Sequence, residues 1–169
     1  MFELSMGAMM AKQDLQPTFG LGNPDVSFQF QGRTVCMECK RVLSQRRILD
    51  NISEAVHQLE SCVRPGTGDV GLVAISVSRL AHQGNGYWQT PSLEIGRAFL
   101  ANELRRMVSD IDPRLAQLNR SHAAGVIFFV SGPLCVDNIG FTVAGEGIVY
   151  PLNPAESAFL HDFATTARL

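Results

Sequence analysis

The sequence predicts a single α/β domain in which a mixed central sheet is flanked by helices. Residues 25–40 alternate between polar and apolar side chains, as expected of a β-hairpin, and residues 71–78 form a nearly continuous apolar run, as expected of a buried strand. Apolar stripes at helical spacing cover 46–63 and 90–112. Because 169 residues are enough for one hydrophobic core and few for two, we expect one domain over 1–169.

The first part of the chain predicts a short helix, a loop and the hairpin. Apolar residues recur at helical spacing over 2–12, and two prolines and two glycines over 16–24 are typical of a loop. Strands over 25–30 and 34–40 then flank Gln31-Gly32, which we expect to form a two-residue turn.

This register would bring three charged residues to one face of the hairpin. If Gln31 and Gly32 form the turn, Asp25 lies opposite Glu38, with Cβ atoms roughly 4.5–5.5 Å apart. Two carboxylates at that separation repel each other unless a cation or a proton lies between them. Lys40 is two residues beyond Glu38 and therefore projects from the same face.

The remaining segments continue the alternation of helices and strands. The helix over 46–63 precedes the buried strand over 71–78, which we place centrally in the sheet. The polar, glycine-containing stretch over 81–89 is typical of a loop. Five elements are expected after it: a helix over 90–112, a strand over 125–130, short strands over 140–144 and 147–150, and a closing helix over 154–168.

Composition and charge exclude several classes of protein. With 46% hydrophobic and 18% charged residues, the chain is not intrinsically disordered. A net charge of -2 argues against a protein that coats nucleic acid or membrane through bulk charge, so any nucleic-acid contact must be local. The longest apolar stretches, such as 123–130, are far shorter than the ~20 residues that cross a bilayer.

The sequence also predicts where the protein is located and the state of its cysteines. Neither an export signal nor a membrane segment is indicated, so we expect a cytoplasmic protein without membrane contact. The four cysteines are expected to be free, mostly buried thiols in a reducing compartment. Cys36 and Cys39 form a CxxC pair, but residues three apart on a strand point to opposite faces, which disfavours a zinc or redox role.

Two acids and an amine on one face match the needs of metal-assisted phosphodiester hydrolysis. The carboxylates of Asp25 and Glu38 suit Mg²⁺ or Mn²⁺, which retain water ligands and bind phosphate oxygens. Such an ion lowers the pKa of a bound water, and Lys40 would position that water or stabilise the charged transition state.

These residues also resemble a known family. Pro24-Asp25 and Glu38-Cys39-Lys40, joined by a hairpin, resemble the two halves of the motif of the PD-(D/E)xK superfamily of restriction-endonuclease-like nucleases. In that superfamily a helix that often carries a glutamine follows the lysine-bearing strand, and a core strand comes next. The helix over 46–63 with Gln58, and the strand over 71–78, are similar to those two elements.

The resemblance implies a restriction-endonuclease-like mixed sheet flanked by helices and a metal-dependent nuclease, with DNA as the expected substrate. Asp25, Glu38, Lys40 and Gln58 would be catalytic, with Asp25 and Glu38 as ligands of Mg²⁺ or Mn²⁺. Members commonly carry an acidic residue on a helix before the hairpin, and Glu3 would take that place as a further ligand.

Two alternatives remain open at this stage. One is a catalytically inactive domain of the same fold that serves as a nucleic-acid-binding or assembly module, and the other is an unrelated α/β domain whose hairpin mimics the motif. The resemblance covers about 24–78, and the C-terminal elaboration over about 90–169 is a candidate for specificity elements or a homodimer interface.

Two further groups are candidates for nucleic-acid contacts. Arg41, Arg46 and Arg47 follow the motif directly and would clamp backbone phosphates, unless they only face solvent. Tyr87-Trp88 lies in a polar stretch and would either stack on bases or anchor that stretch against the core.

Overall fold

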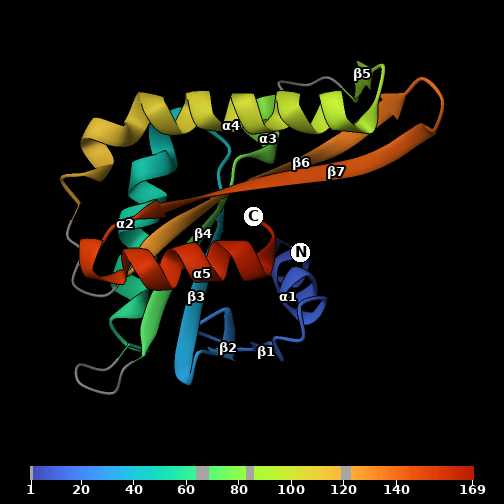
Figure 1. Cartoon of the computed structure of the whole chain (residues 1–169). Helices are drawn as coiled ribbons and strands as arrows, with labels where there is room; N and C mark the ends of the chain where they lie inside the picture. The colour runs from blue at the N-terminus through green and yellow to red at the C-terminus, as the bar shows by residue number, and fades with distance from the viewer. Residues whose placement is uncertain (1, 64–68, 83–85, 119–122) are drawn as a thin grey trace.

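The computed structural model describes residues 2–63, 69–82, 86–118 and 123–169 (Figure 1). Its strands are β1 (Thr18–Phe19), β2 (Val26–Phe30), β3 (Arg33–Arg41), β4 (Val70–Ser76), β5 (Trp88–Thr90), β6 (Gly125–Val136) and β7 (Gly140–Pro151). Its helices are α1 (Phe2–Ala11), α2 (Ile48–Leu59), α3 (Ser78–His82), α4 (Leu93–Leu115) and α5 (Ser157–Ala167), with 3₁₀ turns η1 (Gln45–Arg47) and η2 (Pro154–Glu156).

The seven strands form one mixed sheet, which confirms the predicted α/β class. The strand order is β1-β2-β3-β4-β6-β5, and β7 pairs with β6. The pairs β1–β2 and β2–β3 are antiparallel, whereas β4 is parallel to both β3 and β6. The buried strand predicted over 71–78 is β4, and it lies between β3 and β6 in the interior of the sheet.

Helices cover both faces of the sheet. Apolar side chains of α2 and α4 pack on one face, and those of α1 and α5 pack on the other. Figure 1 shows α4 lying along the β6–β7 hairpin, with α5 on the opposite side of these strands. None of the helices within the described ranges is long and apolar enough to cross a membrane.

The β2–β3 hairpin has the register that the alternation predicts. Phe30 pairs with Arg33, and Val26 pairs with Met37. Gln31 and Gly32 connect the strands with positive φ angles of 51° and 73°. This geometry suits the right-handed twist of a hairpin, and glycine adopts it without steric strain.

Helix α2 crosses from β3 to the parallel strand β4 and therefore runs back against β3. Its apolar stripe is buried as predicted, with Ile48, Ile52 and Leu59 fully enclosed. The helix is shorter than the range 46–63, because its first residues form η1 and the regular helix ends at Leu59. Cys62 and Val63 still pack against the same core.

Several strand and loop boundaries that the sequence predicted for the second half of the chain were wrong. Instead of three short strands, β6 and β7 form one hairpin in which twelve residues of each strand pair. One edge of β6 pairs with β7 along its whole length. The opposite edge pairs with β4 as far as Phe129 and with β5 from Leu134 onward, so Pro133 lies where this edge has no partner strand, which is why a proline is tolerated there. The stretch 81–89 contains the end of α3 and most of β5, and residues 83–85 lie outside the described ranges.

Pro113 does not end α4, which continues to Leu115. Proline removes one backbone donor and crowds the preceding turn, but only a single turn of helix follows it here. That turn is closed by the Ala116 N–H, which donates to the Asp112 carbonyl at 3.1 Å. Burial of Leu115 against the sheet explains why the chain stays helical past the proline.

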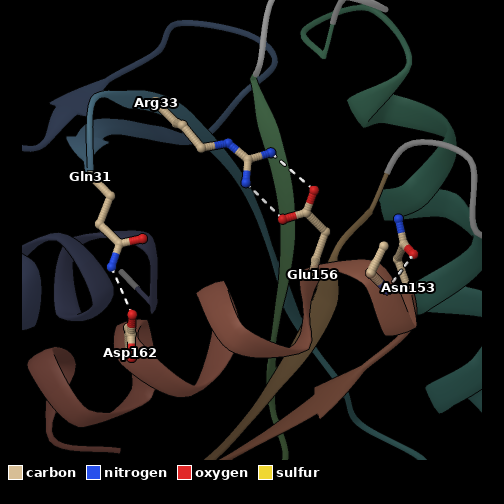
Figure 2. Close-up of polar contacts among 6 residues, drawn as sticks. Gln31, Arg33, Asn153, Glu156 and Asp162 are labelled. Atoms are coloured by element: carbon tan, nitrogen blue, oxygen red, sulfur yellow. Dashed lines mark hydrogen bonds and ion pairs between the residues drawn. The ribbon is translucent and has the colours of Figure 1, made fainter.

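The C-terminal helix holds the tip of the β2–β3 hairpin. The Arg33 guanidinium donates two hydrogen bonds to the Glu156 carboxylate, at 2.7 and 3.0 Å, and the Gln31 amide donates to Asp162 at 2.9 Å (Figure 2). The guanidinium holds the pKa of Glu156 below its usual value. Asn153 caps the preceding turn by accepting from the Ala155 N–H, which fixes the approach of α5.

Aromatic side chains complete this junction below the polar contacts. Phe163 of α5 is fully buried and stacks on Phe28 with ring centroids 5.8 Å apart. Phe30 meets Phe163 and Phe159 edge to face, at 5.7 and 5.4 Å. The hairpin that carries Glu38 therefore shares its core with the last helix of the chain.

We expect Phe163→Ala to lower the free energy of unfolding by about 3–5 kcal/mol, because it removes a fully buried aromatic ring at this junction. Urea denaturation followed by circular dichroism measures the change. The control is His161→Ala, on the exposed side of the same helix, which should shift the value by less than about 0.5 kcal/mol. Equal values for the two variants would show that α5 is not part of this core.

Candidate active site

The site begins with two apposed carboxyl groups. Asp25 immediately precedes β2, and extending the register by one pair places it opposite Glu38 of β3. The Cys39 N–H donates to Asp25 Oδ2 at 2.8 Å, which fixes the Asp25 side chain against β3. Asp25 is near enough to Glu38 for its negative charge to add to the effect of burial in raising the pKa of Glu38. The opposition predicted from the hairpin register is therefore present.

Glu38 is a buried acid. Its side chain is only 1% exposed, and Oε1 has no hydrogen-bond partner among the described residues. Burial raises the pKa of the Glu38 carboxyl to about 7, and the negative charge of Asp25 acts in the same direction. Lys40 opposes this shift. A carboxyl group in this state calls for a proton or a cation beside it.

Lys40 points from the same face of β3 toward α2. Its ammonium group donates to Glu54 Oε1 at 3.1 Å. The Lys40 side chain is 17% exposed, whereas that of Glu54 is 60% exposed, so solvent screens the pair and its strength is modest. Sequence analysis did not identify Glu54. The available signal was its position one helical turn before Gln58, on the polar edge of the apolar stripe.

Gln58 lies level with Glu38. The pair of Lys40 and Glu54 fixes one point of contact between β3 and the antiparallel helix α2. Glu38 lies two residues before Lys40 on β3, and Gln58 lies four residues after Glu54 on α2. Because the two elements run in opposite directions, both steps lead the same way, and each covers about 6 Å. The Gln58 Oε1 atom is buried and, like Glu38 Oε1, has no hydrogen-bond partner within the described residues. By this count along strand and helix, we expect Gln58 at about the level of Glu38.

Glu3 lies on the other face of the sheet. It belongs to the first turn of α1, whose apolar side chains pack against Met37 and Cys39. Its negative charge acts on Cys39, which packs on the same face as α1. Burial raises the pKa of the Cys39 thiol, and the charges of Asp25 and then Glu3 add to that shift. The role of Glu3 as a metal ligand stays a prediction.

The three arginines that were predicted to clamp phosphate lie between the end of β3 and the start of α2. Arg41 ends β3, and Arg46 and Arg47 belong to η1, directly before α2. All three side chains are exposed, and Arg47 lies 3.9 Å from Asp50, a weak surface pair. Arg46 and Arg47 therefore lie near the end of β3 that carries Lys40, whereas Arg41 follows the alternation of the strand to the face of Cys39 and α1.

The other candidate residues divide into surface and core. Trp88 stacks on His82, with ring centroids 3.9 Å apart, and meets Phe99 edge to face, so it anchors β5 against the core. Tyr87 is 49% exposed. The CxxC pair points to opposite faces, since Cys36 packs with α2 and Cys39 packs with α1, and all four cysteines are free.

The number of ligands that the protein offers to a metal is small. Within the described ranges, no group of three or more His, Cys, Asp or Glu side chains is arranged to hold an ion. Asp25 and Glu38 form a pair, and the Gln58 amide oxygen is the nearest neutral addition by the register given above. This set suits a hard cation that keeps several waters, because it contains oxygen ligands only.

Comparison with protein-family models, with curated proteins and with solved structures finds no match to this chain. The interpretation of the site therefore depends on its residues and geometry. The arrangement comprises two apposed acids, of which Glu38 has a raised pKa, together with an adjacent ammonium group and nearby exposed cations.

The buried acid predicts how stability depends on pH when EDTA is present. The pKa of Glu38 is about 7 in the folded protein and about 4.5 in the unfolded chain, so the folded state binds the proton more tightly. The free energy of unfolding should therefore fall by about 1–3 kcal/mol as pH rises from about 4.5 to about 7. Urea denaturation across this range measures the slope.

Glu38→Gln should remove this slope, because the amide has the same shape and does not ionise. Glu94→Gln, at an exposed glutamate, should retain the slope of the parent protein. A Glu38→Gln protein that keeps the parent slope would show that Glu38 does not titrate in this range.

Proposed function

We propose that the protein is a metal-dependent nuclease that hydrolyses phosphodiester bonds, with DNA as the expected substrate. The observation that carries the proposal is the buried Glu38 carboxyl, which faces Asp25, has an unpartnered oxygen and lies on the same strand face as Lys40. A stable fold gains nothing from such a group, and perturbed acids of this kind cluster at functional sites.

The order of elements supports a restriction-endonuclease-like interpretation of the fold. A helix with an acidic residue in its first turn, α1 with Glu3, precedes three antiparallel strands. Helix α2 and the parallel strand β4 follow the strand that carries Glu38 and Lys40. The helix before the hairpin, the hairpin, the following helix and the core strand are the elements that the resemblance to the PD-(D/E)xK superfamily implies.

The donor set fits a divalent cation such as Mg²⁺ or Mn²⁺. Asp25 and Glu38 would hold the ion, and the Gln58 oxygen, which is buried without a partner among the described residues, would be a further ligand. When bound, the ion would lower the pKa of a coordinated water and offset charge on the scissile phosphate. The ion would also satisfy the buried Glu38 oxygen, which otherwise lacks a partner.

The residues of the chain would divide the remaining work. The Cys39 N–H orients the Asp25 carboxylate through its hydrogen bond. Lys40 brings a positive charge to the attacking water or to the phosphate oxygens, where charge develops in the transition state. In the structure this ammonium group contacts Glu54, which is itself largely exposed. Arg41, Arg46 and Arg47 would bind neighbouring phosphates.

Lys40→Ala should lower kcat for cleavage by about 100-fold or more, because it removes a charge that stabilises the transition state. The measurement is cleavage of fluorescently labelled single-stranded and duplex DNA with Mg²⁺ or Mn²⁺, with EDTA as the blank. Lys12→Ala is the matched control, since Lys12 is the other lysine of the chain and is exposed.

Equal cleavage by the Lys40→Ala variant and the parent would contradict the proposed mechanism. Absence of cleavage by the parent with either metal, on every substrate, would favour the alternative of an inactive domain of the same fold. Cleavage that persists in EDTA would exclude the role of the metal.

Metal binding should also be visible without catalysis. At pH 8, saturating Mn²⁺ should raise the free energy of unfolding of the parent by about 2–3 kcal/mol, as expected for a ligand at 100 times its Kd or more. Asp25→Asn should lose most of this gain, whereas the exposed Asp137→Asn should keep it. Differential scanning fluorimetry with and without Mn²⁺ gives the comparison, and equal gains in the two variants would place the ion elsewhere.

A further inference from the structure

A polar groove of about 390 Å³ lies on the sheet beside the candidate active site. It is formed by β1, β2, β3 and the segment before β1. Besides Phe28, its lining consists of six polar side chains: Asp14, Gln16, Thr18, Ser27, Gln29 and Thr34. The proposed catalytic steps use none of these residues.

The strand register connects this groove with the acid pair. Thr18 lies opposite Ser27, and Ser27 lies opposite Cys36. Side chains of opposed residues point to the same face of a sheet, as do residues two apart on one strand. Asp25 and Glu38 are the next residues on this face, two positions from Ser27 and Cys36. The groove and the acid pair therefore share one surface, and one step of roughly 6–7 Å separates Ser27 from Asp25.

The lining is suited to neutral polar groups. Hydroxyl and amide side chains both donate and accept hydrogen bonds, and the Gln29 amide already donates to Thr34 Oγ1 at 3.0 Å. Among the residues that line the groove, none is Lys or Arg, and Asp14 carries the single charge. Such a surface disfavours phosphate but matches the edges of nucleobases, which carry the same donors and acceptors.

The size of the groove restricts the kind of nucleic acid that could bind in it. Its volume is within the range of pockets that enclose a small molecule, roughly 300–1,000 Å³. A base inside a duplex is paired and stacked, and it enters a pocket only after it leaves the stack. A base in a single strand has free edges. The groove therefore favours an unpaired nucleotide.

We propose that this groove holds the unpaired nucleotide next to the scissile phosphate, so that the substrate is single-stranded DNA. The inference rests on the proposed nuclease function and adds to it the strand type and the residues that select it. Gln29 and Thr34 are positioning residues in this account, because they contact the nucleotide and not the reacting atoms.

The test compares the parent with Gln29→Ala/Thr34→Val on a labelled single-stranded oligonucleotide and on the same sequence as a blunt duplex, with Mn²⁺. We expect KM for the single strand to rise about tenfold with kcat within about twofold, since two hydrogen-bonding groups are lost. Gln89→Ala is the matched control, because Gln89 is also an exposed glutamine on a strand, β5, and it should leave both constants unchanged.

A second measurement separates the groove from catalysis. Fluorescence anisotropy in EDTA reports the Kd of the same single strand, and the double variant should raise it about tenfold. An unchanged KM and Kd in the double variant, or equal kcat/KM of the parent on single strand and duplex, would contradict the proposal that the groove binds an unpaired nucleotide. Weaker binding by the double variant in EDTA, together with no cleavage by the parent, would support the groove and refute the proposed nuclease.

Discussion

The register of the β2–β3 hairpin is the constraint on which the candidate site depends. Because side chains alternate along a strand, a shift of one residue would turn Glu38 and Lys40 to the face of α1 and bury the apolar residues on the wrong side. The turn at Gln31-Gly32 and the apolar face that includes Val26 and Met37 both select the observed pairing. The polar face, with the acid pair and the adjoining groove, follows from that choice.

Helix α2 then decides the electrostatic state of the acid pair. By covering the polar face of β3, it takes the Glu38 carboxyl out of solvent and raises its pKa to about 7. The same helix provides Glu54 to Lys40 and carries Gln58, whose side-chain oxygen is buried without a hydrogen-bond partner among the described residues. A buried, incompletely satisfied acid destabilises a fold, so its presence here is better explained by chemistry than by stability.

The second half of the chain stabilises the hairpin that carries this site. Helix α5 packs aromatic side chains against β2 and binds Gln31 through Asp162, and Glu156 of the preceding turn η2 binds Arg33 at the hairpin tip (Figure 2). These contacts join residues more than 120 positions apart. The pattern of the C-terminal segment predicted a helix, but no local signal indicated that it would hold the hairpin, because such contacts depend on how the whole sheet assembles.

By itself, the sequence determined the features that depend on near neighbours: the hairpin and its turn, the opposition of Asp25 and Glu38, the position of Lys40, and the buried stripe of α2. Only the tertiary structure decided the rest. It extended β6 through Pro133 and α4 through Pro113, paired Lys40 with Glu54, and enclosed Glu38. The reason is physical: alternation and turn geometry act over a few residues, whereas burial, strand partners and pKa depend on segments brought together by the fold.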